Sequence, residues 1–439
     1  MCAKKKDRTA ELLGLINQSP TAFHAVNTVS KMLLKDGFVE LNEADEWKLE
    51  AGKGYFVTRN QSAIIAFRLP RGEAEHFLIA ASHTDSPMFK VKKEALSSAC
   101  GEYLRLNTEV YGGTILSTWT DRPLTLAGRV IVKDGELFRS ELVHIDRDLL
   151  LIPNVAIHLN RGVNSGYSYN PAVDMLPLFA QEKDEDDALL TLLAKELNCD
   201  VESIVGTELY VVNRTPSTVW GKNGEFFSAP RIDNLMCAYG TLEGFRASAP
   251  KNAVTVYYAA DNEETGSSTK QGAGSVFLSD TVDRICEALE KDKRRMLASS
   301  MMVSADNGHA KHPNHPELSD AQNAPKLNGG VVIKYNAAQK YTTEGLSAAI
   351  FEEICRRADV PVQCYANRSD MPGGSTLGSI SNTLVPLMTV DIGMAQLAMH
   401  SAYETAGSRD TEHLVAAMKA FYSCRLTASG DGVYRLLNA

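Results

Sequence analysis

Residues 77–87 read FLIAASHTDSP, an apolar run that ends abruptly in His83, Thr84 and Asp85. Such a run is typical of a buried strand, and Pro87 cannot continue the hydrogen-bond ladder. Taken alone, the polar residues form the kind of turn that follows many strands. Their meaning therefore depends on whether other strands of the chain end in the same way.

Four other segments follow a strand or a turn with the same kinds of residue, namely Asp233 in APRIDN, Glu263 and Glu264 in DNEETG, Asp306 in SADNGH and His400 in QLAMHS. Each segment also has an ordinary interpretation when it is considered alone. DNEETG suits an acidic surface turn, Asp306 suits a helix N-cap, and His400 suits a core histidine. Their repetition at successive strand ends favours a shared site.

Apolar runs alternate with helical patterns along much of the chain, which predicts an α/β fold with a mostly parallel sheet flanked by helices. Helices are expected over residues 8–36, 234–247, 281–295, 344–357 and 410–427. Strands are expected within 47–70 and over 77–82, 253–260, 301–305, 330–333 and 384–390. Ligands of such sheets bind beyond the carboxyl ends of the strands, so residues far apart in sequence can meet in one crevice.

The sequence pattern changes between about residue 88 and residue 228, where short β-like runs are separated by Gly, Asn and Pro turns. One helix is expected there, over residues 186–197 (DDALLTLLAKEL). We therefore divide the chain into a first domain of residues 1–90 and 229–439 and an inserted β-rich domain of residues 91–228.

The composition is that of a globular protein with 439 residues, 44% of them hydrophobic, and a net charge of −9. This charge argues against a general nucleic-acid or acidic-membrane surface. No run reaches the roughly 20 apolar residues of a membrane span, and the N-terminus has no secretory signal. The eight cysteines include no C-x-x-C pair and suit thiols better than disulfides. We therefore expect a cytoplasmic protein with no nucleic-acid or membrane partner.

The residues at the strand ends are of the types that bind divalent metal ions. Two imidazoles (His83 and His400) and three carboxylates (Asp233, Glu264 and Asp306) suit a pair of ions. Mixed nitrogen and oxygen ligation favours zinc, with manganese and cobalt as alternatives. Hydrolases hold two such ions about 3.5–4 Å apart and use them to clamp the attacking and leaving oxygens.

Two adjacent glutamates can take different roles in such a site. Neighbouring side chains of an extended segment point in different directions, so Glu264 can face a metal while Glu263 faces the bound water. A carboxylate beside such a water is a natural general base. Asp85, two residues beyond His83, suits acceptance of the free ring N–H of that histidine.

The complete series of motifs resembles the aspartyl aminopeptidase family of co-catalytic zinc metallopeptidases. The resemblance covers nearly the whole chain and rests on eight motifs in family order, namely ASHTDSP, IPNVAIHLNR, APRIDN, DNEETGS, SADNGHAKHPN, VIKYNAAQKY, SDMPGGSTLG and QLAMHS. The resemblance implies that Asp233 bridges two zinc ions. His83 and Asp306 would complete the ligand set of one ion, and Glu264 and His400 that of the other.

The resemblance also implies that Glu263 is the general base and that Asp85 is the partner of His83. For the fold, it implies a zinc-exopeptidase-like catalytic domain that is interrupted by the β-rich insertion as a dimerisation domain. The family assembles into a large homododecamer built from dimers, so self-association is expected.

Three further residues have a role only through the resemblance. His158, in AIHLNR, would by default be a buried structural histidine, and the resemblance makes it a residue that reaches into a neighbouring subunit's active site. A lysine such as Lys334 is usually solvated, and the resemblance places Lys334 and Tyr341 near the side chain of an acidic N-terminal residue. A carboxylate that enters a net-negative protein needs a local cation and hydroxyl donors.

Two loops complete the expected pocket. His309, His312 and His315 lie in turn-rich HAKHPNHP, and we interpret them as residues of the pocket rim rather than as a metal cluster. Gly373 and Gly374, in MPGGSTLG, could present backbone N–H groups to the substrate. This loop lacks the GK[ST] ending of a phosphate loop.

These features predict a metallo-aminopeptidase, a hydrolase that releases Asp or Glu from the N-termini of peptides with a metal-bridging water activated by Glu263. A related metal aminopeptidase or deacylase of broader specificity is the alternative within the enzyme class. From another class, the alternative is a non-catalytic self-assembling protein with a relict metal site. Such relics usually lose the base or a ligand, whereas this chain has Glu263 and all five ligand positions.

Overall fold

The strand that carries the opening motif, β4 (His76–His83), lies in the middle of a nine-stranded sheet, and all of its residues are buried. The computed structural model describes residues 7–181 and 187–438. The strands of this sheet follow the order β1 (Val39–Leu41), β2 (Gly54–Arg59), β3 (Ala63–Arg68), β13 (Ala253–Ala260), β4, β14 (Met301–Ala305), β18 (Met388–Gly393), β16 (Val331–Tyr335) and β17 (Val362–Ala366). The central strands β13, β4, β14 and β18 are parallel to one another, so their carboxyl ends share one edge.

Helices cover both faces of this sheet. One face packs against α1 (Arg8–Gln18), α2 (Ala22–Lys35), α5 (Ile232–Ala247), α8 (Gly345–Arg357) and α10 (Asp410–Tyr422). The other face packs against α6 (Phe277–Ala288), α7 (Lys293–Ala298) and α9 (Leu377–Ser381). Successive side chains of β4 alternate between the two cores, with Leu78 in the first and Ile79 in the second, because a strand points its side chains to opposite faces.

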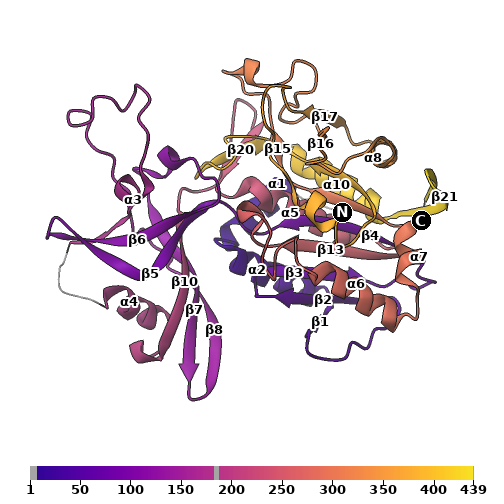
Figure 1. Ribbon diagram of the computed structural model, residues 1–439, viewed down its shortest axis with the longest axis horizontal. Coiled ribbons are helices and arrows are strands. Elements are labelled where there is room, and N and C mark those ends of the chain that lie inside the picture. Colours follow the sequence, from indigo (N-terminus) through magenta and orange to yellow (C-terminus); the bar gives the residue numbers. More distant parts are fainter. Residues whose placement is uncertain (1–6, 182–186, 439) are drawn as a thin grey trace, which may run out of the picture.

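A second lobe, on the left of Figure 1, is built on an antiparallel sheet. Its six strands follow the order β8 (Leu137–His144), β7 (Leu124–Asp134), β10 (Ile204–Asn213), β5 (Met88–Ala99), β6 (Tyr103–Tyr111) and β9 (Leu178–Ala180). The lobe also contains α3 (Pro171–Asp174) and α4 (Ala188–Leu197), and it has its own apolar core. We call it the inserted lobe, because it interrupts the chain between β4 and α5.

Two smaller sheets complete the architecture. A five-stranded sheet follows the order β11 (Thr218–Trp220), β12 (Phe226–Ala229), β20 (Glu404–Gly407), β19 (Ala395–Leu397) and β15 (Gly308–His309). A hairpin near the C-terminus pairs β21 (Cys424–Gly430) with β22 (Val433–Asn438). Within the described residues, no helix is long and apolar enough to cross a membrane.

The expected α/β class, with its mostly parallel sheet, is confirmed, and the strands at 253–260 and 301–305 have the expected bounds. The expected helix over 8–36 is two helices, because Pro20 restricts the backbone of Ser19 before it. The expected strand at 384–390 begins later, at Met388, because Pro386 cannot donate to a ladder.

Three expected helices also need correction or a narrower boundary. The helix over 281–295 is two helices, α6 and α7, and Glu290 between them has a left-handed φ of 53°. The helix over 410–427 ends at Tyr422, and the residues after it pair as β21 with β22, so tertiary pairing overrides helical periodicity. The helix over 186–197 begins at Ala188, and residue 186 lies outside the described residues.

Candidate metal centre

The polar residues that end the central strands lie close together, as the parallel direction of these strands predicts. His83 is the last residue of β4, and Asp306 directly follows β14. The short helix η3 (Glu263–Thr265) follows β13 after two residues. Because β13, β4 and β14 are parallel neighbours, these residues lie at one edge of the sheet.

Two groups of potential ligands meet on the two oxygens of Asp233. The Nε2 atom of His83 lies 3.6 Å from Asp233 Oδ1 and 3.7 Å from Asp306 Oδ1. The Nε2 atom of His400 lies 3.6 Å from Asp233 Oδ2 and 3.3 Å from Glu264 Oε2. The structure thus brings together His83, Asp233, Glu264, Asp306 and His400, which we call the ligand cluster.

The other ring nitrogen of each histidine has a partner that orients it. His83 Nδ1 lies 3.1 Å from the carbonyl oxygen of Asp85 and 3.3 Å from its Oδ1. His400 Nδ1 donates to the carbonyl oxygen of Gly113 at 3.0 Å. These contacts place the ring proton on Nδ1, which leaves each Nε2 available as a metal ligand.

The charges of the cluster call for a cation. Burial, and then the negative charge of Asp233, raise the pKa of Glu264 well above its ordinary value. Asp233 Oδ1 and Glu264 Oε1 are buried atoms that receive no hydrogen bond from any described residue. Such oxygens are costly unless a cation or donor meets them, and this mixture of imidazole and carboxylate suits zinc. The residues present therefore fit a divalent metal.

Glu263 occupies the position next to the cluster. Burial first, and then the negative charges of Asp306, Asp85 and Asp233, raise the pKa of Glu263 to about 8, against the opposing charge of His83. The backbone N–H groups of Glu263 and Glu264 both donate to the Asp85 carboxylate, at 3.1 and 3.2 Å. Asp85 therefore orients the glutamate turn as well as His83.

A segment of the inserted lobe, Tyr111-Gly112-Gly113 at the end of β6, completes the surroundings of the cluster, and we did not predict it. The Tyr111 hydroxyl donates to Asp85 at 2.7 Å. Gly112 has a φ of +72°, and a Cβ atom there would lie 3.1 Å from Cβ of Glu264. The sequence signal is a pair of glycines directly after a strand, which indicates a close approach of the backbone.

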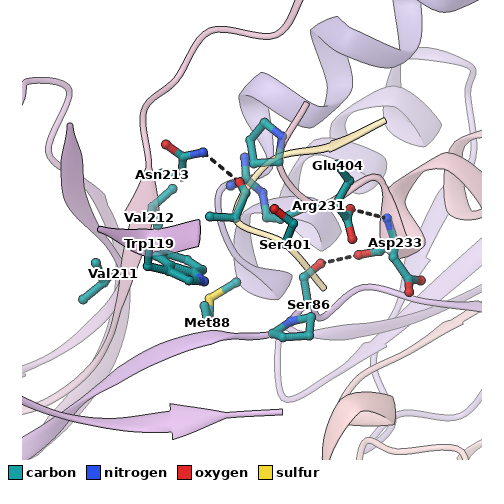
Figure 2. Close-up of a pocket in the computed structure, with 13 residues that line it drawn as sticks. Ser86, Met88, Trp119, Val211, Val212, Asn213, Arg231, Asp233, Ser401 and Glu404 are labelled. Carbon is teal, nitrogen blue, oxygen red and sulfur yellow. Dashed lines mark hydrogen bonds between the residues drawn. The ribbon is translucent and has the colours of Figure 1, made fainter. Parts of the chain in front are cut away.

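The backbone of Asp233 is held from both sides, as Figure 2 shows. The Ser86 hydroxyl donates to the carbonyl oxygen of Asp233 at 2.7 Å, and Glu404 accepts from the N–H of Asp233 at 3.0 Å. Nearby, Asn213 of the inserted lobe donates to the carbonyl oxygen of Ala402 at 2.7 Å. Ser86 and Glu404 therefore fix the backbone of the residue that joins the two ligand groups, and the inserted lobe contacts the segment between His400 and Glu404 through Asn213.

Lys334 and Tyr341 lie close to Asp306. The Lys334 side chain is buried, and its Nζ donates to the carbonyl oxygens of Asp306 at 2.7 Å and Asn307 at 3.4 Å. The same Nζ lies 3.7 Å from Asp306 Oδ2 and 5.1 Å from the centre of the Tyr341 ring. The lysine is thus close to the ligand cluster and already contacts the backbone of one ligand.

The remaining predicted residues lie at the periphery. His309 and Gly374 line a cavity of about 290 Å³, which also contacts His312. Gly373 packs closely, because a Cβ atom there would lie 2.5 Å from Asn367 Oδ1. His158 is exposed in a loop of the inserted lobe, and no hydrogen bond or ion pair among the described residues joins it to the ligand cluster.

Comparisons with known proteins find relatives of this chain over nearly its whole length. A family model described as "Aminopeptidase I zinc metalloprotease (M18)" matches residues 15–422. The "Probable M18 family aminopeptidase 2" of Clostridium novyi (strain NT) is 44% identical over 423 residues, which are 94% of this chain and 98% of that protein. Its counterpart in Pseudomonas savastanoi pv. phaseolicola is 39% identical over 419 residues, 94% of this chain and 97% of that protein.

Solved structures are similar over the same length. The cryo-EM structure of the Ape4 and Nbr1 complex has a TM-score of 0.91 and 37% identity, and the match covers 95% of this chain and 85% of that chain. The structure described as the S. cerevesiae mApe1 dodecamer has a TM-score of 0.84 and 25% identity, and the match covers 95% of this chain and 96% of that chain.

The glycine pair yields a test of the contact between the lobes and the cluster. We expect Gly112→Ala to weaken zinc binding about tenfold or more, because the new Cβ would press on Glu264. Gly135→Ala is the matched control, since Gly135 has a φ of +60° and a Cβ there would meet no atom within 4 Å. Both variants carry backbone strain of about 1–3 kcal/mol. Equal zinc affinities in the two variants, measured by chelator competition, would refute the crowding argument.

Proposed function

We propose that this chain, which belongs to the M18 family of aminopeptidase I zinc metalloproteases, releases acidic residues from the N-termini of peptides. Family membership gives the metallo-aminopeptidase activity, and the preference for Asp or Glu is our addition. The observation that carries the metal-dependent part of the proposal is Asp233, whose two carboxylate oxygens face different histidines with further carboxylates beside them.

We assign two divalent ions to each subunit, zinc in the first place, with manganese or cobalt as alternatives. Asp233 would be shared, His83 and Asp306 would hold one ion, and Glu264 and His400 the other. Bound there, zinc supplies a Lewis acid for the scissile carbonyl and lowers the pKa of the attacking water. The two uncompensated buried oxygens of the cluster support this assignment.

Glu263 moves the proton. In the proposed reaction its carboxylate takes a proton from water while the water oxygen attacks the carbonyl carbon of the first peptide bond. As the carbon–nitrogen bond breaks, Glu263 returns the proton to the leaving amine nitrogen, which then departs as the new N-terminus. Asp85 accepts hydrogen bonds from the Tyr111 hydroxyl and from the N–H groups of Glu263 and Glu264. It thereby fixes the position of Glu263 relative to His83.

Lys334 and Tyr341 would recognise the acidic side chain, with His309, Gly373 and Gly374 at the rim. A buried ammonium next to the cluster supports this role, because a desolvated carboxylate needs a cation. One observation favours a second candidate, an aminopeptidase or deacylase of broader specificity. Lys334 Nζ already donates to the carbonyl oxygen of Asp306, so its charge is partly engaged in holding a ligand.

We further propose self-association, as a homododecamer built from dimers. The dodecamer described for the similar mApe1 supports this, as do the exposed apolar side chains Val155, Ile157 and Leu159 around His158. In the assembly His158 would reach a neighbouring active site, and residues 91–228 would form the dimerisation domain of a catalytic unit that comprises 1–90 and 229–439. The seven described cysteines are free, which supports the cytoplasm as the location.

The function is tested by aminopeptidase turnover of the purified protein on Asp-, Glu-, Ala- and Leu-terminal substrates. We expect turnover on the acidic substrates to exceed that on the neutral ones by about tenfold or more, as one charge-assisted hydrogen bond allows. Chelation should abolish the activity, and zinc, manganese or cobalt should restore it. Equal activity on neutral substrates would refute the acidic preference but not the assignment of the metal ions. An inert protein that is assembled and metal-replete would favour the non-catalytic alternative.

Glu263→Gln tests the base. We expect kcat to fall by about 10²–10⁴, because the amide cannot accept a proton, while metal content and melting temperature stay unchanged. Glu102→Gln, at an exposed turn of the inserted lobe, controls for the loss of one negative charge. Near-normal turnover of Glu263→Gln with metals bound would contradict the proton assignment.

Lys334→Met separates the two candidate roles of the lysine. If Lys334 binds the substrate carboxylate, kcat/KM should fall about tenfold or more on Asp-terminal substrates and little on Leu-terminal ones. Lys326→Met, which removes an exposed cation, should leave the ratio unchanged. Equal losses on both substrates would assign Lys334 to the support of Asp306 and favour broader specificity.

A further inference from the structure

Three buried polar side chains form a continuous chain of hydrogen bonds beside the ligand cluster. Asn307, Gln396 and Glu404 are 3%, 1% and 2% exposed. Asn307 Nδ2 donates to Gln396 Oε1 at 2.7 Å, and Gln396 Nε2 donates to Glu404 Oε1 at 3.2 Å. We call these residues the polar chain. None of them has a place in the proposed reaction.

One end of the polar chain holds two residues of the ligand cluster by their backbones. Glu404 Oε2 accepts from the N–H of Asp233 at 3.0 Å, a contact visible in Figure 2. Glu404 Oε1 accepts from the N–H of His400 at 2.8 Å. His400 has a φ of +67°, a strained conformation for a residue with a side chain, which persists only where surrounding contacts hold it.

The other end of the polar chain reaches the remaining ligand segments. Asn307 directly follows Asp306, and its Nδ2 also donates to the carbonyl oxygen of Ile232 at 3.2 Å, one residue before Asp233. Asn307 Oδ1 accepts from the N–H of Met394 at 3.3 Å and from the Cys237 thiol at 3.1 Å. The polar chain thus joins the segment after β14, the start of α5 and the turn between β19 and β20.

The chemistry of Glu404 suits this task better than it suits simple packing. A buried carboxylate is costly, and an apolar side chain could fill the same space. A carboxylate, however, carries only acceptors, so both oxygens can receive N–H groups from two ligand segments at once. A glutamine of the same shape would turn an NH₂ group toward one of these donors.

We propose that Glu404 is a positioning residue, held in place by Gln396 and Asn307. It sets the distance between Asp233 and His400, and therefore the position of one ligand group relative to the other. The inference rests on the proposed two-metal site. It assigns Glu404 no contact with substrate or reacting atoms, and its expected effect is on metal affinity and geometry.

Glu404→Gln in the full chain tests the proposal. We expect zinc affinity, measured by competition with a chelator, to fall about tenfold or more for at least one ion. The visible absorption spectrum of the Co²⁺-loaded variant should differ from that of the wild type, because the ligand geometry changes. Asp410→Asn is the matched control, since Asp410 is a buried carboxylate that accepts from the N–H groups of Asn328 at 2.6 Å and Gly330 at 3.1 Å. It should lower the melting temperature of the metal-free protein without changing affinity or spectrum.

A Glu404→Gln protein that behaves like Asp410→Asn, with lower stability but wild-type affinity and spectrum, would overturn the proposal. If Glu404→Gln does not fold, Gln396→Met takes its place, because it removes the brace and keeps the volume. It should weaken zinc binding several-fold, and unchanged binding would overturn the role of the polar chain. Wild-type protein that binds metals but hydrolyses no peptide would refute only the proposed function, and wild-type protein that binds no metal would refute both.

Discussion

The burial of several carboxylates and two histidines at one edge of the central sheet is the constraint on which the rest of this structure depends. Burial, and then the neighbouring negative charges, raise the pKa of Glu263 and Glu264, and two carboxylate oxygens accept no hydrogen bond from any described residue. Buried carboxylates are costly unless cations or hydrogen-bond donors meet their oxygens, so the residues must be held where such partners can reach them. The parallel strands, the glutamate turn and the bonded backbone of Asp233 all serve this requirement.

The site is assembled from backbone as much as from side chains. Asp85 receives two N–H groups of the glutamate turn, Glu404 receives the N–H groups of two ligand residues, and the carbonyl oxygen of Gly113 orients His400. Each contact joins segments that are distant in sequence. The positions of the ligands therefore depend on the relative placement of whole elements, which two apolar cores on the sheet and one in the inserted lobe make rigid.

The sequence predicted what is encoded locally and missed what depends on distant contacts. Strand β4 and its terminal His83 were evident because an apolar run ends in a polar triplet, and the glutamate turn was evident for the same reason. Glu404 and Tyr111 gave no such signal, because their partners lie far away along the chain. The role of Lys334 came only from the family resemblance, and no local pattern shows that its ammonium contacts the carbonyl oxygen of Asp306. The break at Glu290 was missed because the helical periodicity continues across it.

The contact of Gly113 with His400 has a consequence for how this architecture could arise or be shortened. By topology the inserted lobe is a module, since its sheet and core are its own. The lobe nevertheless contributes to the surroundings of both histidines. The Tyr111 hydroxyl donates to Asp85, the partner of His83, and the carbonyl oxygen of Gly113 accepts from His400. A chain without the inserted lobe would keep the five residues of the ligand cluster and lose the hydroxyl of Tyr111 and the carbonyl oxygen of Gly113. The two lobes are therefore linked at the ligand cluster, although each has an apolar core of its own.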